Sequence, residues 1–98
     1  MGSVHITPSV YAPNARDGYH QLKEEAYYEH GHNSYNGTIT TTYDFKMLPF
    51  LEGESSTDWF ERTMHECGKR EICCVEATHV EKNDKGWPLW HFGGWAAE

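Results

Sequence analysis

Two apolar runs near the end of the chain, separated by a short polar stretch, constrain the fold more than any other feature. The first, REICCVEATHV at 70–80, is rich in β-branched and apolar residues, and the second, WPLWHFGGWA at 87–96, is aromatic. Between them, NDKG at 83–86 has the composition of a turn. The sequence therefore predicts an antiparallel hairpin whose first strand is central in a sheet.

Proline and glycine interrupt two of the expected strands. In the aromatic strand they are Pro88, Gly93 and Gly94. Proline cannot donate a hydrogen bond to a neighbouring strand and glycine weakens a strand interior, so we expect this strand at an edge or bulged. The pattern at 4–11 also predicts a strand, and Pro8 favours an edge or a bulge there too.

Helical periodicity occurs twice in the rest of the chain. Asn14 or Asp17 can cap a first helix, which ends at Gly31. The stretch SSTD at 55–58 has capping-box spacing and opens a second helix that ends at Gly68. The residues expected on the buried side of the second helix are Phe60, Met64 and Cys67.

The segment between the two helices changes period. From 37 to 45, Ile39, Thr41, Tyr43 and Phe45 alternate with polar residues, which predicts a half-solvated antiparallel strand. The expected order is therefore strand, helix, strand, helix, strand, strand. This order predicts a small α+β fold in one domain, residues 1–98, with two helices packed on a mostly antiparallel sheet.

The charge of the chain limits its partners. Fifteen acidic residues against eight basic ones give a formal net charge of −7, which argues against nucleic acid as a direct partner. The carboxylates are scattered along the sequence, so mimicry of DNA is not favoured. No apolar run approaches the ~20 residues that span a bilayer, and no leader pattern opens the chain. We therefore expect a cytoplasmic protein, in a host cell, with no membrane partner.

Cysteine and histidine are the residues that would carry metal or nucleophilic chemistry. Cys67, Cys73 and Cys74 make an odd count, and neighbours on a strand point to opposite faces, so we expect buried thiols in a reducing compartment. No paired spacing typical of zinc and no local signature of a catalytic cysteine is present. We predict no metal, no cofactor and no enzyme activity. A cysteine/histidine-based hydrolase or metal protein is kept as a third hypothesis.

The stretch EHGHNSYNGTI at 29–39 is the strongest candidate for a site. A helix end at Gly31 followed by a polar turn accounts for most of its residues. A turn requires neither His32 nor Tyr35. Three roles stay open for these two side chains: a plain turn, a hydrogen-bonded brace at the corner between helix and strand, or recognition of a ligand or partner.

The segments EHGH and YNGTI, together with GWAA near the end, resemble small proteins of bacteriophages and their bacterial hosts. In those proteins a helix ending in Gly-His runs into Tyr-x-Gly-Thr-Ile, and several close with an aromatic strand ending in Gly-Trp-Ala. The resemblance covers residues 19–42 and 87–97, and implies no established activity. It maps onto Gly31, His32, Tyr35, Gly37, Thr38 and Ile39.

Small size, acidity and aromatic content lead to the functional prediction. We expect a non-enzymatic accessory protein of a phage or mobile element that binds a host protein stoichiometrically, such as an inhibitor of a CRISPR or restriction defence system. The alternative is a small-ligand or nucleotide-binding protein that uses residues 32–39. The predicted binding residues are His32, Tyr35, Asn36, Trp90 and Trp95. We do not expect all four tryptophans in the core, and a homodimer is one use for an exposed indole.

Overall fold

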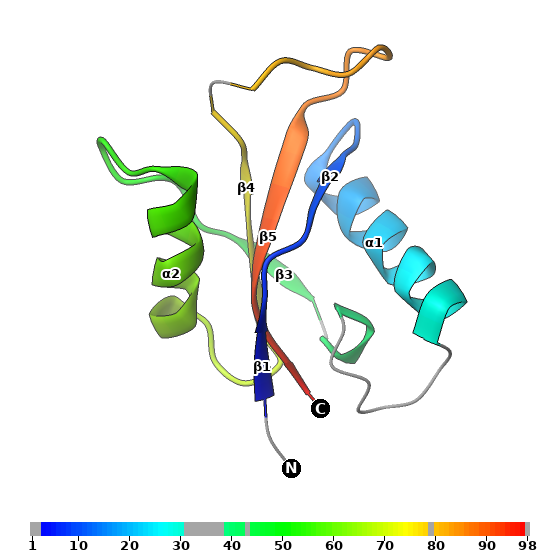
Figure 1. The fold of residues 1–98 in the computed structure, drawn as a ribbon, viewed down its shortest axis with the longest axis vertical. Helices are drawn as coiled ribbons and strands as arrows, with labels where there is room; N and C mark the ends of the chain where they lie inside the picture. Colours follow the sequence, from blue (N-terminus) through cyan, green and yellow to red (C-terminus); the bar gives the residue numbers. More distant parts are fainter. Residues whose placement is uncertain (1–2, 31–38, 43, 79, 98) are drawn as a thin grey trace.

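Figure 1 shows the computed structural model of the chain, which describes residues 3–30, 39–42, 44–78 and 80–97. The strands are β1 (Ser3–Ile6), β2 (Ser9–Tyr11), β3 (Phe45–Met47), β4 (Ile72–Glu76) and β5 (Leu89–Ala97). The helices are α1 (Ala15–His30), α2 (Ser56–Glu66) and the short 3₁₀ helix η1 (Ile39–Thr41). The α+β class and the expected order of elements are confirmed, with the first strand present as two consecutive pieces.

The five strands form one sheet with β5 in its interior. β1 and β2 pair with one side of β5, β4 pairs with the other side, and β3 adds to β4. All pairings are antiparallel except that of β3 with β4. The expected hairpin of β4 and β5 is confirmed, and so is its turn, where the Gly86 amide donates to the Asn83 carbonyl oxygen at 2.9 Å.

The expectation that the aromatic strand lies at an edge or is bulged is wrong, because its glycines permit close approach instead. A Cβ atom at Gly94 would collide with the backbone of Glu71, just before β4. A Cβ atom at Gly93 would lie 2.9 Å from Thr63 Oγ1, in α2. Pro88 precedes the strand, where its missing amide costs no hydrogen bond of the sheet.

The two helices cover opposite faces of the sheet (Figure 1). Successive side chains of β4 point to opposite faces and so separate two cores. The buried cluster on the α1 side comprises Val10, Tyr19, Ile39, Ile72, Cys74 and Phe92. The buried cluster on the α2 side comprises Trp59, Cys67, Cys73 and Val75.

The strand expected at 4–11 is broken at Pro8 into β1 and β2. Both pieces pair with β5 at the edge of the sheet. Pro8 has no amide hydrogen to donate, but its carbonyl oxygen accepts from the Phe92 amide at 2.8 Å. The proline therefore interrupts the strand without changing its partner.

The expectation of a strand across 37–45 is wrong. Its described part contains η1, and only the short strand β3 follows, parallel to β4. The Thr42 amide and hydroxyl both donate to the Ile39 carbonyl oxygen, at 3.0 and 2.6 Å. Threonine hydroxyls that bond the nearby backbone compete with strand pairing. The Tyr19 hydroxyl donates to Thr42 Oγ1 at 2.6 Å and fixes this turn against α1.

Helix α1 forms where its periodicity predicts. Asn14 is the residue that caps it, because its Oδ1 atom accepts from the Asp17 amide at 2.8 Å. The helix buries Tyr19 and packs Leu22 against the same core. The expected stop at Gly31 lies outside the described residues.

Candidate functional site on the α2 helix

Helix α2 begins at the expected capping sequence. Ser55 is the N-cap, with an extended backbone, and its Oγ atom accepts from the Asp58 amide at 3.1 Å. Asp58 also places a negative charge in the first turn, at the positive end of the helix dipole. The helix is followed by Cys67, whose amide donates to the Thr63 carbonyl oxygen at 3.1 Å.

The buried side of α2 differs from the expected one. Trp59 and Thr63 are completely buried, whereas Met64, expected inside, is 40% exposed. Cys67 is buried as expected, and Phe60 is half-buried and packs against the same cluster. The expectation is therefore wrong for Met64 alone. The Trp59 indole donates to the Leu48 carbonyl oxygen at 2.8 Å, which ties α2 to the chain leaving β3.

Two histidines of the sheet hold α2 through its hydroxyl groups. His5 Nε2 in β1 donates to Thr63 Oγ1 at 2.9 Å, because the Thr63 hydroxyl itself donates to the Phe60 carbonyl oxygen. In β5, His91 Nε2 lies 3.1 Å from Ser56 Oγ. Ser56 and Thr63 are seven residues apart, which is about two helical turns, so both hydroxyls lie on one side of α2.

His91 is fixed on both ring nitrogens. Its Nδ1 atom lies 2.7 Å from Ser9 Oγ in β2, so the imidazole connects β2 to Ser56 at the start of α2. The ring packs against Phe60 at a centroid distance of 4.9 Å and is almost fully buried. Burial disfavours the imidazolium and lowers the pKa of His91 below 6.5, and it lowers the pKa of His5 in the same direction. Both rings are therefore neutral braces at neutral pH.

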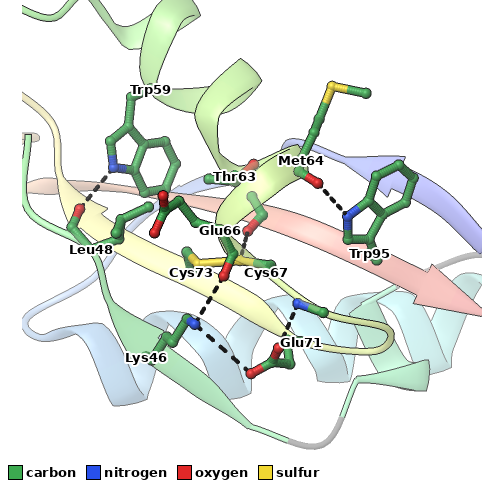
Figure 2. The surroundings of a disulfide bond; sticks show 12 residues. Lys46, Leu48, Trp59, Thr63, Met64, Glu66, Cys67, Glu71, Cys73 and Trp95 are labelled. Atoms are coloured by element: carbon green, nitrogen blue, oxygen red, sulfur yellow. Dashed lines mark hydrogen bonds and ion pairs between the residues drawn. A yellow bond between two sulfur atoms is a disulfide. The ribbon is translucent and has the colours of Figure 1, made fainter.

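A disulfide joins Cys67, after the end of α2, to Cys73 in β4 (Figure 2). The expectation of three unpaired thiols is wrong for these two cysteines, which lie six apart in sequence and 6.7 Å apart at their Cα atoms. Cys74 is the free cysteine and lies on the other face of the sheet. Burial raises the pKa of the Cys74 thiol to about 12, so it is inert as a nucleophile.

The loop that leads into α2 is braced by an ion pair. Arg62 Nε donates to Glu54 Oε2 at 2.8 Å, and Arg62 donates through its terminal nitrogen to Glu54 Oε1 and to the Pro49 carbonyl oxygen, at 2.9 and 2.8 Å. These bonds lower the pKa of the Glu54 carboxyl and raise the pKa of Arg62. Arg62, the only basic side chain of residues 51–66 apart from His65, is thereby engaged by partners within the chain.

The outward side of α2 and its leading loop carry most of the excess negative charge. Residues 51–66 contain five acidic side chains and one arginine, a formal charge of −4 within a chain of −7. Two apolar side chains are exposed among these carboxylates, Leu51 at 58% and Met64 at 40%. We call this region the acidic α2 surface, and its exposed members are Leu51, Glu52, Asp58, Glu61, Met64 and Glu66.

The structure describes two of the five residues that the sequence predicts as binding residues. His32, Tyr35 and Asn36 lie outside the described residues. The other two, Trp90 and Trp95, pack on opposite faces of the sheet, where their indoles donate to the carbonyl oxygens of Ala12 and Met64. The prediction that the four tryptophans are not all core residues is confirmed, because only Trp59 is fully buried.

A groove of about 370 Å³ runs beside α1, and its walls mix charge with aromatic rings. Lys23 Nζ lies 5.1 Å above the Tyr19 ring and donates to the Thr42 carbonyl oxygen. The residues that line this groove are Arg16, Tyr19, His20, Lys23, Glu24, Tyr27 and Asp44. In the part of the chain that the structure describes, no three histidine, cysteine or acidic residues are placed to hold a metal ion.

Comparison of the chain with protein-family models, with curated proteins and with solved structures gives no match. The resemblance to phage proteins therefore stays a prediction. No described helix has the length and apolar character needed to cross a membrane.

The hydroxyl and imidazole groups that hold α2 were not predicted from the sequence. One signal was available for them, because Ser56 and Thr63 have the spacing of a single helix side. Their partners His5 and His91 carry no local signal, since these contacts join residues 58 and 35 positions apart.

Proposed function

We propose that this protein is a non-enzymatic binding protein whose acidic α2 surface docks stoichiometrically onto a basic surface of another protein. The observation that carries the proposal is the concentration of negative charge around exposed Leu51 and Met64. Apolar contacts surrounded by charged groups are typical of protein interfaces, and complementary charge speeds the encounter and selects the partner.

The way α2 is held supports this use. A disulfide, two histidine bonds and an indole bond fix the helix before any partner arrives. A surface that is already ordered loses less conformational entropy on binding, so more of the contact energy becomes affinity. The setting in a phage or mobile element, and a host defence protein in the cytoplasm as the partner, form the finer part of the proposal and come from the sequence resemblance.

Matched charge variants test the proposal. Asp58→Asn/Glu61→Gln removes two exposed carboxylates from α2, and Glu24→Gln/Glu25→Gln removes two exposed carboxylates from α1. We expect proteins captured from a bacterial extract by the parent chain to be retained by the α1 variant and lost by the α2 variant. A purified partner should then form a complex of defined stoichiometry in analytical ultracentrifugation. Equal capture by both variants would contradict the proposal, and self-association alone would assign the surface to a homodimer.

The α1 groove favours a second candidate, a small-ligand-binding protein. Its volume of about 370 Å³ lies within the range of small-molecule sites, and Arg16 and Lys23 supply positive charge for an anionic ligand. Nucleotides added to labelled protein would shift the NMR signals of Arg16 and His20 if the groove is used. Unchanged spectra at millimolar nucleotide would remove this candidate.

A further inference from the structure

The two sulfur atoms of the disulfide differ in their access to solvent. Cys73 is completely buried in β4, where it pairs with Gly93 of β5. Cys67 keeps 6% of its surface exposed and lines a shallow hollow of about 250 Å³. The other residues that line this hollow are Ser3, Gly68, Lys69 and Trp95. A molecule in this hollow therefore meets Cys67 before it meets Cys73.

The hollow suits a small anionic molecule. Lys69 is exposed at its wall and, within the described residues, makes no ion pair. The neighbouring Lys46 is already engaged, because its Nζ atom donates to the Glu66 carbonyl oxygen at 3.1 Å and lies 3.9 Å from the Glu71 carboxylate (Figure 2). Lys69 is thus available to attract an incoming carboxylate, while the ring of Trp95 forms an apolar wall.

We propose that Cys67 is a thiol–disulfide exchange site for small anionic thiols that enter through this hollow. The incoming thiolate attacks Cys67 Sγ, a new sulfur–sulfur bond forms there, and the bond to Cys73 breaks. Cys73 leaves as a thiolate and takes up a proton. The products are a mixed disulfide on Cys67 and a buried thiol at Cys73, and no other oxidant or reductant is consumed.

Burial makes the adduct long-lived. Reclosure of the disulfide requires the thiolate of Cys73, because the thiol itself is a poor nucleophile. The released Cys73 thiol is completely buried, out of contact with the solvent that must take up its proton before reclosure, so the mixed disulfide persists.

An adduct on Cys67 changes the end of α2. It occupies the hollow that Trp95 lines, and the Trp95 indole donates to the Met64 carbonyl oxygen at 3.1 Å (Figure 2). Displacing that indole removes a bond from the last turn of the helix, next to the exposed Met64 side chain. Modification therefore weakens docking by the acidic α2 surface, and this consequence alone rests on the proposed function.

The experiment uses the full oxidised chain and reduced glutathione as the anionic probe. Thiol counting on freshly purified, denatured protein should give one free thiol per chain, which is Cys74. After incubation with glutathione, intact-mass and peptide analysis should place one adduct on Cys67, accompanied by a change in tryptophan fluorescence. Three free thiols at the start, or an adduct on Cys73, would overturn the proposal.

Two controls separate access from charge. Lys69→Gln should slow adduct formation with glutathione by about 1.5- to fivefold, the factor that one exposed ion pair supplies. The same variant should react with the cationic thiol cysteamine at least as fast as the parent chain does. Cys74→Ser should leave the adduct on Cys67. Equal rates for Lys69→Gln and the parent would refute the role of the hollow. These measurements need no binding partner, so failure here leaves the proposed docking function standing, and failure of docking leaves the exchange site standing.

Discussion

Gly93 is the point where α2 lies closest to the sheet, and Gly93→Ala tests how the helix is seated. The added Cβ atom would lie 2.9 Å from Thr63 Oγ1, 3.1 Å from Thr63 Cγ2 and 3.0 Å from Phe60 Cδ1. Thr63 is completely buried, so the contacts are relieved only by lifting α2 away from β5. Extra atoms in a well-packed core cost about 1–3 kcal/mol. In a chain of 98 residues this cost lowers Tm by about 4–24 °C.

The assay is urea unfolding at pH 7.5, followed by tryptophan fluorescence. Gly86→Ala is the matched control, because its Cβ atom would meet no neighbour within 4 Å and only its positive φ of +80 is unfavourable. A Thr63→Ala background distinguishes the two mechanisms. Truncating Thr63 removes two of the three close contacts, so it should offset part of the cost of Gly93→Ala and leave the cost of Gly86→Ala unchanged within about 0.5 kcal/mol.

Two results would refute this reasoning. One is a free energy of unfolding for Gly93→Ala within about 0.5 kcal/mol of the parent chain. The other is strict additivity of Gly93→Ala with Thr63→Ala, because two groups in steric contact must show a coupling energy.

The remaining predictions concern the other contacts that hold α2. Burial lowers the pKa of His91, so this histidine takes up a proton at higher pH in the unfolded chain than in the folded chain. The contribution of neutral His91 to the free energy of unfolding is therefore fully present above about pH 6.5, and it is lost as the pH falls through the lowered pKa. Urea titrations from pH 7.5 to 5 check this, and His91→Gln should flatten the dependence. Ser55→Ala should cost about 0.5–2 kcal/mol through loss of the helix cap, measured by the same unfolding assay. Trp59→Phe should cost about 1–3 kcal/mol, because the Leu48 carbonyl oxygen loses its indole donor, and a smaller loss would show that water replaces the indole.

The sequence predicted the features that depend on only a few neighbouring residues, namely helix caps and a turn. Asn14 caps α1, Ser55 caps α2, and the turn at 83–86 joins the hairpin, as expected. The prediction of a strand at 37–45 was wrong for a local reason too. A threonine hydroxyl can form a hydrogen bond with the nearby backbone, as Thr42 does, and this bond competes with strand pairing. Periodicity alone does not distinguish these two outcomes.

Contacts between distant parts of the chain could not be predicted in this way. In the sequence, Gly94 predicts a weakened strand. The folded chain shows that glycine is required there, because a Cβ atom would collide with the backbone of Glu71. The bond between Ser9 and His91 joins residues 82 positions apart. The acidic α2 surface was not predicted, because the carboxylates look scattered along the sequence. The pairing of Arg62 with Glu54, which leaves the other carboxylates of residues 51–66 uncompensated, depends on the folded loop.

By our proposal, the acidic α2 surface is the part of this protein that a partner covers. Hydrogen exchange of the purified complex, compared with that of the free chain, measures this directly. We expect added protection across residues 51–66 and little change over α1, in the parent chain and in Glu24→Gln/Glu25→Gln. Protection over α1 with unchanged exchange across residues 51–66 would contradict it.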